Sequence, residues 1–367
     1  MHFCFLTGLY SRYDVLMFER QGKSLVQAGF KVTYLVCDDK PNEIKDGIEI
    51  ISTNFMPKTR LDRFLNTKKI LLNHINKIDA DIYQISDPEL IQLIIPLKRK
   101  KKKVVFNLRE YYPDMILSKQ YIPKLFRSII SKFYKMNMKK YLKEYDNVFV
   151  VTTWIIDILK KDFNLNNVNL LTNFPIVNKD YQLSCEDYIK RDNVLCYIGT
   201  VYKGSNQENV FQALNNISNI KYIIAGRIED NYESIKEHYY WKNVTFVDGF
   251  KYDELPKYFS MATISNTLRD FGKNDGSLGV IKIFESMEIA LPVLFSDVPL
   301  YREMVDKYHC GICVNPNDSK DIEKAIRYLI ENRKEAYEMG QRGRKAVIDE
   351  YNWDKQAERY IEIINNL

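Results

Sequence analysis

The stretch that decides the fold, residues 276–297, reads GSLGVIKIFESMEIALPVLFSD. It opens with a loop of small residues at 276–279 and continues with apolar residues at helical spacing over 281–289. Pro292 ends the helix, and the apolar run 293–295 is typical of a short buried strand. A loop, a helix and a strand in this order make half of a βαβ unit, so the stretch predicts a parallel sheet covered by helices.

The start of this helix suits an anion. Its first N–H groups have no partner within the helix, and the helix dipole places positive charge there, which favours a diphosphate. Lys282 and Glu285 are three residues apart and share one face of the first turns. The lysine would offset phosphate charge, while the carboxylate would accept hydrogen bonds from both hydroxyls of a ribose. By spacing alone, an ordinary exposed ion pair on a surface helix is the favoured alternative.

The run 282–297, KIFESMEIALPVLFSD, resembles the K-x-F-E-x-M-A-x-G-x-P-V-x-x-S-D signature of retaining glycosyltransferases of family 4. The resemblance implies the α/β GT-B fold, in which two Rossmann-like domains with parallel sheets face each other and a C-terminal helix crosses back to the first domain. It makes Glu285 the acid that holds the donor ribose. Two residues depart from the pattern: Ala290 stands where glycine is usual, and Ser277 stands where many members have a first glutamate that touches the donor sugar.

The chain has 367 residues, 46% of them apolar and 28% charged, so it is long enough for two domains with separate cores. No segment approaches the ~18 apolar residues of a membrane span, and the N-terminus lacks a basic segment and a cleavage site, which predicts a cytoplasmic protein. Cys310 and Cys313 have no second ligand pair at comparable spacing, which argues against zinc. Asp79 and Asp81 form a D-x-D triplet, but they precede an apolar strand instead of following one, which argues against a metal site.

Charge is unevenly distributed along the chain. Residues 1–170 carry 29 lysines and arginines against 18 acidic residues, whereas residues 171–367 carry 25 against 30. The six consecutive cations 98–103 and the basic, aromatic-rich helix predicted over 121–145 suit an anionic membrane surface, so we expect peripheral binding to the inner face of the cell membrane. Nucleic acid is the rival partner, but no binding motif accompanies the charge, and a solvated helix packed on a core fits the same pattern equally well.

In the first half, apolar strands alternate with helices, which predicts a doubly wound parallel sheet. The strands are expected near residues 2–8, 31–37, 47–51, 81–85, 103–107 and 147–151. Ligands of such sheets bind at the carboxyl ends of the strands, so the loops there are the candidate sites. The loops 86–90 and 109–119 resemble the H-D-P-E-L and H-E-x-Y-P-E-x-I-L-S-K blocks of family 4. Ser86 and Arg109 stand where these relatives usually have histidine.

From these loops we expect an acceptor site and possible bases. The residues expected to bind the acceptor are Arg12, Asp14, Ser86, Arg109 and Glu110. Asp87 and Glu110 are the carboxylates placed to act as a base, and Gly8 would let the backbone approach the donor. Because no histidine lies in a candidate loop, we expect no histidine proton shuttle and nearly constant activity between about pH 6 and 8.5.

Hydrophobic periodicity lapses over residues 173–190, which predicts an interdomain linker. The first domain would then comprise 1–172 with a returning helix at 353–367, and the second 191–352. Strands of the second domain are expected near residues 194–198, 221–225, 244–247, 262–265, 293–295 and 312–314. The donor-binding residues expected there are Gly199, Lys203, Arg227, Lys251, Gly276, Ser277, Leu278, Gly279, Lys282 and Glu285.

These expectations combine into one function. The protein would pass a sugar from a UDP- or GDP-sugar to a growing glycan, such as one on a lipid carrier, with retained configuration as the resemblance implies. Lys203 and Lys282 would stabilise the departing diphosphate without a metal or cofactor. Two alternatives stay open: a nucleotide-sugar epimerase of the same architecture, and a catalytically silent subunit that binds sugar nucleotides.

Overall fold

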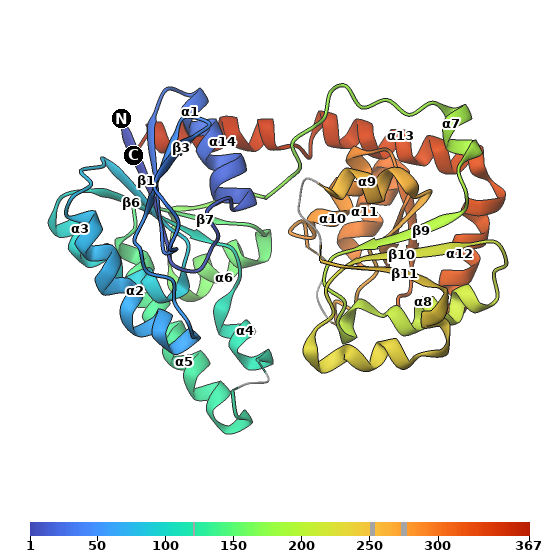
Figure 1. Cartoon of the computed structure of the whole chain (residues 1–367), viewed down its shortest axis with the longest axis horizontal. Coiled ribbons are helices and arrows are strands. Elements are labelled where there is room, and N and C mark those ends of the chain that lie inside the picture. Colours follow the sequence, from blue (N-terminus) through green and yellow to red (C-terminus); the bar gives the residue numbers. More distant parts are fainter. Residues whose placement is uncertain (120–121, 250–253, 273–276) are drawn as a thin grey trace. The chain divides into compact units, whose positions relative to one another are not determined.

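The structure, a computed structural model, describes residues 1–119, 122–249, 254–272 and 277–367. By their contacts they divide into two compact units (Figure 1). Unit 1 comprises Met1–Asn173 and Gln356–Leu367, and unit 2 comprises Phe174–Lys355. Each unit is built on a mainly parallel sheet flanked by helices, as the GT-B fold predicts.

Unit 1 contains an eight-stranded sheet in the order β3-β4-β2-β1-β5-β6-β7-β8. Its strands are β1 (His2–Thr7), β2 (Lys31–Val36), β3 (Glu43–Lys45), β4 (Ile48–Ser52), β5 (Ile82–Ile85), β6 (Lys103–Leu108), β7 (Asn147–Val150) and β8 (Val168–Leu170). Only β3 runs antiparallel, at the edge beside β4. The six predicted strands are confirmed to within one residue at each end. The two edge strands β3 and β8 were missed, because three residues are too few to show a period of two.

The helical segments of unit 1 are η1 (Val15–Gly22), α1 (Lys23–Gln27), α2 (Arg60–Ile75), η2 (Pro88–Leu93), α3 (Ile94–Arg99), α4 (Tyr112–Ser118), α5 (Lys124–Tyr141), η3 (Leu142–Glu144) and α6 (Thr153–Phe163). The π-helix η1 begins after Asp14, whose carboxylate accepts the N–H groups of Leu16 and Met17 at 3.1 and 2.8 Å. This cap satisfies N–H groups that the helix itself leaves without partners. Across the residues that the structure describes, no helix is long and apolar enough to cross a membrane.

The predicted returning helix is confirmed as α14 (Trp353–Asn365), whose contacts from Gln356 onward are made with unit 1. Tyr360 is buried and donates its hydroxyl to Gln84 Oε1 of β5 at 3.0 Å. Its ring also packs on Phe3 of β1 and Phe149 of β7. The last helix is therefore part of the core of unit 1.

Unit 2 contains a six-stranded parallel sheet in the order β11-β10-β9-β12-β13-β14. Its strands are β9 (Val194–Ile198), β10 (Lys221–Gly226), β11 (Val244–Asp248), β12 (Ile264–Asn266), β13 (Val293–Ser296) and β14 (Gly311–Val314). Its helical segments are α7 (Cys185–Lys190), η4 (Lys203–Ser205), α8 (Gln207–Asn215), η5 (Asp230–Glu237), η6 (Tyr239–Asn243), α9 (Leu255–Met261), α10 (Ile281–Glu288), α11 (Pro299–Tyr308), α12 (Ser319–Glu331) and α13 (Arg333–Asp349). All six predicted strands are present, with β12 displaced from 262–265 to 264–266.

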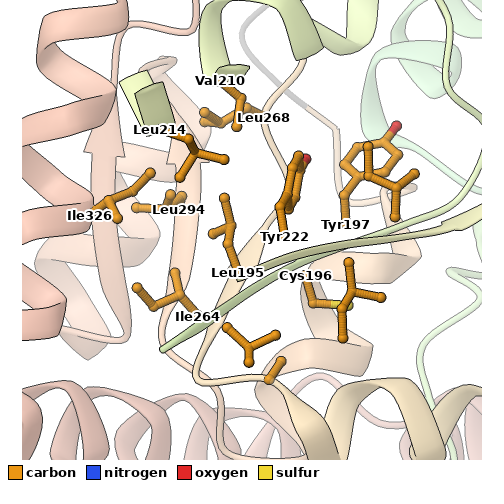
Figure 2. Close-up of a cluster of buried hydrophobic side chains, with 14 of the residues drawn as sticks. Leu195, Cys196, Tyr197, Val210, Leu214, Tyr222, Ile264, Leu268, Leu294 and Ile326 are labelled. Atoms are coloured by element: carbon orange, nitrogen blue, oxygen red, sulfur yellow. The ribbon is translucent and has the colours of Figure 1, made fainter. Parts of the chain in front are cut away.

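The core of unit 2 holds these strands in register. Figure 2 shows Leu195, Ile264 and Leu294, from the adjacent strands β9, β12 and β13, beside Leu214 of α8 and Ile326 of α12. All five side chains are at most 1% exposed. Truncating a leucine or isoleucine in such a core to alanine typically costs about 2–5 kcal/mol. This packing fixes the strand ends from which the candidate site is built.

The predicted linker is wrong for its second half. Residues 185–190 form α7, and Tyr188 on this helix is buried in the core of unit 2. The Tyr188 hydroxyl donates to the carbonyl of Thr263 at 2.6 Å. The lapse in periodicity indicated the boundary near Asn173, but a helix of six residues is too short to show a pattern of its own.

Candidate active site

In unit 2, the ends of β9 and β10 and the start of α10 converge on Gly199. Gly199 follows β9 with φ +131°, a conformation that L side chains rarely adopt. A Cβ atom there would lie 2.9 Å from Lys282 Nζ, and a Cβ atom at Gly226 would lie 2.0 Å from the Gly199 carbonyl oxygen. Both positions therefore require glycine, because the two strand ends and the Lys282 side chain approach one another closely.

Lys282, in the first turn of α10, carries its ammonium group across the ring of Tyr197, with Nζ 3.9 Å from the ring centroid. The Lys282 side chain is partly buried, and loss of water around the ammonium lowers its pKa to about 7. The positive charge of Arg269 lowers this pKa further, and the negative charge of Glu285 opposes the shift. A bound anion would stabilise the charged form of a lysine held in this way.

The start of α10 has no side-chain cap. Its N-cap residue is Val280, so no side chain accepts the first N–H groups of the helix. Ser277 instead folds the loop before the helix: its Oγ accepts the N–H of Gly279 at 3.0 Å, and its carbonyl accepts the Tyr301 hydroxyl at 2.9 Å. Leu278 and Gly279 are partly exposed beside it. The N–H groups of Ile281 and Ile283 donate to the carbonyls of Gly279 and Val280 at 3.1 Å each. An anion at this helix start stays a prediction.

Glu285 lies one turn after Lys282 and is 9% exposed. Glu288, one turn further, has a structural role: its Oε1 accepts the N–H of Asn178 at 2.9 Å and pairs with Arg344 at 3.0 Å. Ala290, which stands where family 4 usually has glycine, ends the helix with φ +56°, the left-handed conformation that glycine adopts without strain.

Two further predicted cations lie on the exposed surface at the same edge of the sheet. Lys203 begins η4, and Arg227 follows β10; both are exposed. Their loops are joined, because the N–H of Val201 donates to the Arg227 carbonyl at 2.8 Å. The predicted residues Lys251 and Gly276 lie outside the described residues.

The structure adds Arg269, which sequence reasoning missed. Arg269 lies three residues after β12, with its Cζ 5.0 Å from the ring centroid of Phe271 and 5.9 Å from that of Tyr202. Its Nε is buried and has no hydrogen-bond partner among the described residues. The rule that selected Arg227, a cation just past a strand, applies equally to Arg269. Because the strand was expected to end at residue 265, Arg269 lay four residues past that end and was not selected as a cation at a strand end.

In unit 1, Asp87 follows β5 and is fully buried. Its Oδ1 accepts the Thr7 hydroxyl at 2.8 Å, and its Oδ2 accepts the N–H groups of Gly8 and Leu9 at 2.6 and 2.8 Å. Loss of water raises the Asp87 pKa to about 7; the charge of Glu89 adds to the rise, and the hydrogen bonds oppose it. Asp87 therefore ties the loop after β1 to the loop after β5. These hydrogen bonds give Asp87 a positioning role, and the catalytic role expected from the sequence stays a prediction.

Two predicted acceptor residues are also structural. Arg12 is buried and forms ion pairs with Asp38 at 2.8 Å and Glu43 at 2.6 Å, so it joins the loop after β1 to the loop after β2. Ser86 is fully buried, and its hydroxyl lies 3.3 Å from Met17 Sδ. Both side chains are buried, and Arg12 also lines a cavity beside these loops. The contact of these two residues with an acceptor stays a prediction.

The other predicted acceptor residues form an ordered group. Arg109 pairs with Asp14 at 2.5 Å, and its Cζ lies 3.7 Å from the ring centroid of Tyr10. Arg109 Nε is buried without a hydrogen-bond partner in the described part of the chain. The Glu110 residue is exposed on the whole. Loss of water around its carboxylate still raises its pKa above the ordinary value, and the charges of Lys119 and Arg109 oppose the rise. Glu110 is thus the predicted carboxylate that is accessible to a ligand in unit 1.

Comparison with known proteins agrees with this architecture. Residues 186–346 match the model of glycosyl transferases group 1, and residues 18–174 match that of glycosyltransferase family 4. The chain is a family 4 type glycosyltransferase. An O-antigen biosynthesis glycosyltransferase of Escherichia coli, WclY, is 22% identical over 342 residues, which cover 90% of this chain and 88% of WclY.

Solved structures show the same fold at lower identity. Sucrose-phosphate synthase from Thermosynechococcus elongatus matches with a TM-score of 0.74 at 16% identity, covering 100% of this chain and 98% of that one. HepE of Anabaena, solved in complex with UDP-glucose, matches with a TM-score of 0.69 at 12% identity, covering the whole of both chains. The glycosyltransferase therefore has the GT-B fold over its whole length.

Each unit of this glycosyltransferase holds a predicted site residue, other than histidine, whose burial brings its pKa to about 7. The expectation of constant activity rested on the absence of any group with a pKa near 7, and that premise is wrong. Burial lowers the pKa of Lys282 and raises that of Asp87, and both reach about 7. Sequence alone does not report burial, so the two groups were assigned their ordinary values.

The carboxylates of the D-x-D triplet have structural partners. Asp79 pairs with Lys102 at 2.5 Å, and Asp81 accepts the N–H of His2 at 2.7 Å. Within the part of the chain that the structure describes, no group of three or more His, Cys, Asp or Glu side chains is arranged to hold a metal ion.

Proposed function

We propose that this glycosyltransferase transfers a sugar with retained configuration from a nucleoside-diphosphate sugar bound by unit 2 to a glycan acceptor bound by unit 1. The observation that carries the proposal is the cation group around Gly199. Lys282 and Arg269 lie close enough for the charge of one to lower the pKa of the other, and neither forms an ion pair among the described residues. Two partly buried cations that form no ion pair in the described part of the chain, with only the negative charge of Glu285 acting on Lys282, favour a ligand with negative charge, such as a diphosphate.

The roles of the residues follow from their positions. The N–H groups at the start of α10, with Lys282, would hold the diphosphate, and Lys203, Arg227 and Arg269 would add positive charge. Glu285 would accept hydrogen bonds from the ribose hydroxyls. Ser277, Leu278 and Gly279 would line the donor sugar. In unit 1, Glu110 with the Arg109–Asp14 pair would contact the acceptor.

The chemistry needs only charge stabilisation. As the bond from the sugar C1 to the β-phosphate oxygen breaks, its electron pair passes to the diphosphate, and the sugar becomes oxocarbenium-like. The acceptor oxygen then bonds to C1 on the same face, and its proton passes to the departing phosphate oxygen. Cations aimed at the developing phosphate charge lower the barrier, so we propose that neither a metal nor a histidine base takes part.

The testing experiment combines binding with product analysis. UDP- and GDP-sugars are screened for thermal stabilisation of the protein, and the selected compound is incubated with glycan acceptors, with and without a chelator. We expect a glycoside of retained configuration in both cases. Isomerisation of the donor sugar would indicate an epimerase instead. Stabilisation without turnover on any acceptor would indicate a silent binding subunit.

We also propose that unit 1 binds an anionic membrane surface through α5. Leu125, Ile129, Phe133 and Met136 on this helix are each more than 60% exposed, and lysines flank them. An exposed apolar row with flanking cations suits insertion among anionic headgroups. On this helix, Lys135 is paired with Asp162, whereas Lys132, Lys139 and Lys140 form no ion pair among the described residues.

The basic run 98–103 is less suited to this task than the sequence suggested. Lys98 and Lys103 both pair with Asp146, and Lys102 pairs with Asp79. Co-sedimentation with phosphatidylglycerol vesicles tests the assignment. Replacing Lys132 and Lys139 by glutamate should weaken vesicle binding by at least about tenfold, since each nearby cation contributes about 1 kcal/mol, while the same change at Lys102 and Lys103 should do less. Equal effects of both pairs would contradict the choice of α5.

A further inference from the structure

Unit 1 contains a cavity of about 490 Å³ to which the proposed reaction assigns no ligand. It lies past the ends of β1 and β2 and reaches the first turn of α2. Gly8, Val36 and Cys37 line its inner part, and Lys40, Lys58 and Arg60 line its outer part. This volume is within the range of small-molecule sites, which is about 300–1,000 Å³.

The charges that line the cavity are unbalanced. Of its other lining cations, Arg12 is paired with Asp38 and Arg63 with Glu89. The ammonium groups of Lys40 and Lys58 form no ion pair or hydrogen bond among the described residues. Asp39 also lines the cavity, but one carboxylate does not balance the two exposed lysines, so the lining keeps a net positive charge. Such a cavity is suited to an anion, and a neutral sugar would leave that charge unused.

An apolar surface adjoins the cavity. Leu61, Phe64 and Leu65 follow the cavity-lining residue Arg60 on α2 and are 66%, 66% and 62% exposed. Their spacing places them on one face of the helix, which we call the α2 strip. The helical segment η2 contacts both α2 and α5, so the α2 strip belongs to the same part of unit 1 as the proposed membrane helix (Figure 1). A contiguous row of exposed apolar side chains is typical of a surface that contacts an apolar ligand or partner.

We propose that the cavity binds the phosphate group of an amphiphilic acceptor whose apolar chain lies along the α2 strip. Lys40 and Lys58 contact the phosphate. This inference rests on the proposed function in one respect only, namely that the ligand is an acceptor; the cavity, its charges and the α2 strip are independent of the donor site in unit 2.

The test measures binding of the full chain to three probes: phosphatidylcholine vesicles that carry a polyprenyl diphosphate, phosphatidylcholine vesicles that carry phosphatidylglycerol at matched surface charge, and inorganic pyrophosphate in solution. We expect at least about tenfold tighter binding to the first vesicles than to the second. Lys40→Ser with Lys58→Ser should abolish this preference and lower the number of pyrophosphate molecules bound by one, because the diphosphate site proposed in unit 2 is unchanged. Phe64→Ser with Leu65→Ser should abolish the preference but leave pyrophosphate binding intact. Lys160→Ser with Lys161→Ser, an equal loss of charge on α6, should change neither.

A wild-type protein that does not prefer the polyprenyl diphosphate, or a Lys40/Lys58 variant that keeps the preference, would overturn the proposal. If the pyrophosphate site that is lost in the Lys40/Lys58 variant bound as tightly as the vesicles, the amphiphilic part would be overturned and a free phosphate compound would be the ligand. All these variants alter exposed side chains, and thermal unfolding checks that each is folded. Binding of the sugar-nucleotide donor is measured in the same samples. If the wild-type protein does not bind a donor, the proposed function is contradicted. If it binds a donor but shows none of the expected binding at the cavity, only this inference is contradicted.

Discussion

The charged side chains that follow the strands are paired differently in the two units. In unit 1, three charged side chains after the strands that are buried or nearly buried are bonded to one another or to the backbone: Arg12 pairs with Asp38, Arg109 with Asp14, and Asp87 accepts three hydrogen bonds. In unit 2, Lys282 and Arg269 form no ion pair within the described residues. The more deeply buried charges at the strand ends of unit 1 thus build its loops, whereas those of unit 2 are available to a ligand.

This difference has a thermodynamic consequence. Removing one partner of a buried charge leaves the other without compensation and destabilises the fold. Removing a cation that forms no ion pair among the described residues, as with Lys282, breaks no such pair and should cost the fold less. Mutations of charged residues should therefore lower stability in unit 1 and lower activity in unit 2.

Lys282 gives the largest expected effect. Lys282→Met should lower kcat/KM by about 10²-fold or more, the usual loss when a donor to developing charge is removed, while the melting temperature stays the same or rises. Steady-state kinetics and thermal unfolding of the same sample measure both, and Lys324→Met, an exposed lysine on α12, is the control. A large drop in melting temperature would show that Lys282 supports the fold and would break the comparison.

Glu285 tests the ribose contact on the same helix. Glu285→Gln should weaken binding of the sugar nucleotide by about 1.5–3 kcal/mol, the scale for hydrogen bonds to a charged group. Titration calorimetry measures the change, and Glu303→Gln, on the exposed side of α11, should leave affinity unaltered. Unchanged affinity in Glu285→Gln would remove this residue from the donor site.

The pKa of Lys282 predicts how donor affinity depends on pH. Its value of about 7 lies below the ordinary 10.5, so the free protein holds the ammonium form below about pH 7 and loses it above. If the diphosphate binds the ammonium form, a proton must be taken up at higher pH, and affinity should fall by up to about tenfold per pH unit above 7. Calorimetry in buffers of different ionisation enthalpy would detect that proton. The same pH dependence in Lys282→Met would assign the titration to another group.

The sequence predicted the parts of the site that depend on short-range order. The loop, helix and strand around Lys282 have a local hydrophobic pattern, so the fold, α10 and the position of Glu285 at its first turns all followed from it. What each ionisable group touches could not be predicted in this way. Asp87 meets the loop after β1 across nearly eighty residues, and Arg12 meets Asp38 across another strand. A residue letter carries no information on such partners, and so both were taken for acceptor-side functional groups.

Asp87 tests the claim that charge in unit 1 is structural. Asp87→Ala should lower the free energy of unfolding by about 1–3 kcal/mol, because the N–H groups of Gly8 and Leu9 lose their acceptor, while Asp87→Asn keeps an acceptor oxygen and should cost less. Since the folded pKa of about 7 exceeds the ordinary 3.8, wild-type stability at this site is greatest at low pH and falls as pH rises towards 7; Asn removes that dependence. Urea unfolding across pH measures both. Loss of turnover in a stable Asp87→Asn protein would make the residue catalytic.

The smallest expected effect concerns Ala290, an uncharged position in unit 2 where a substitution should change stability but not donor binding. Ala290 adopts φ +56°, and Gly340 of α13 holds it there, since a Cβ atom at Gly340 would lie 2.0 Å from the Ala290 carbonyl oxygen. The left-handed conformation costs an L residue about 1–2 kcal/mol, and glycine removes that cost but brings about 0.5–1 kcal/mol of extra entropy in the unfolded chain.

Ala290→Gly should therefore stabilise the protein by about 0.5–1 kcal/mol, which raises the melting temperature by a few degrees and leaves donor affinity unchanged. Asn164, which ends α6 in unit 1 with φ +57°, is the matched control. Asparagine tolerates this conformation better than alanine, so Asn164→Gly should gain less. If Asn164→Gly gained as much, the backbone conformation at Ala290 would not be what the substitution relieves. If donor affinity changed with Ala290→Gly, the end of α10 would be coupled to its start, and stability and binding would not be separable in unit 2.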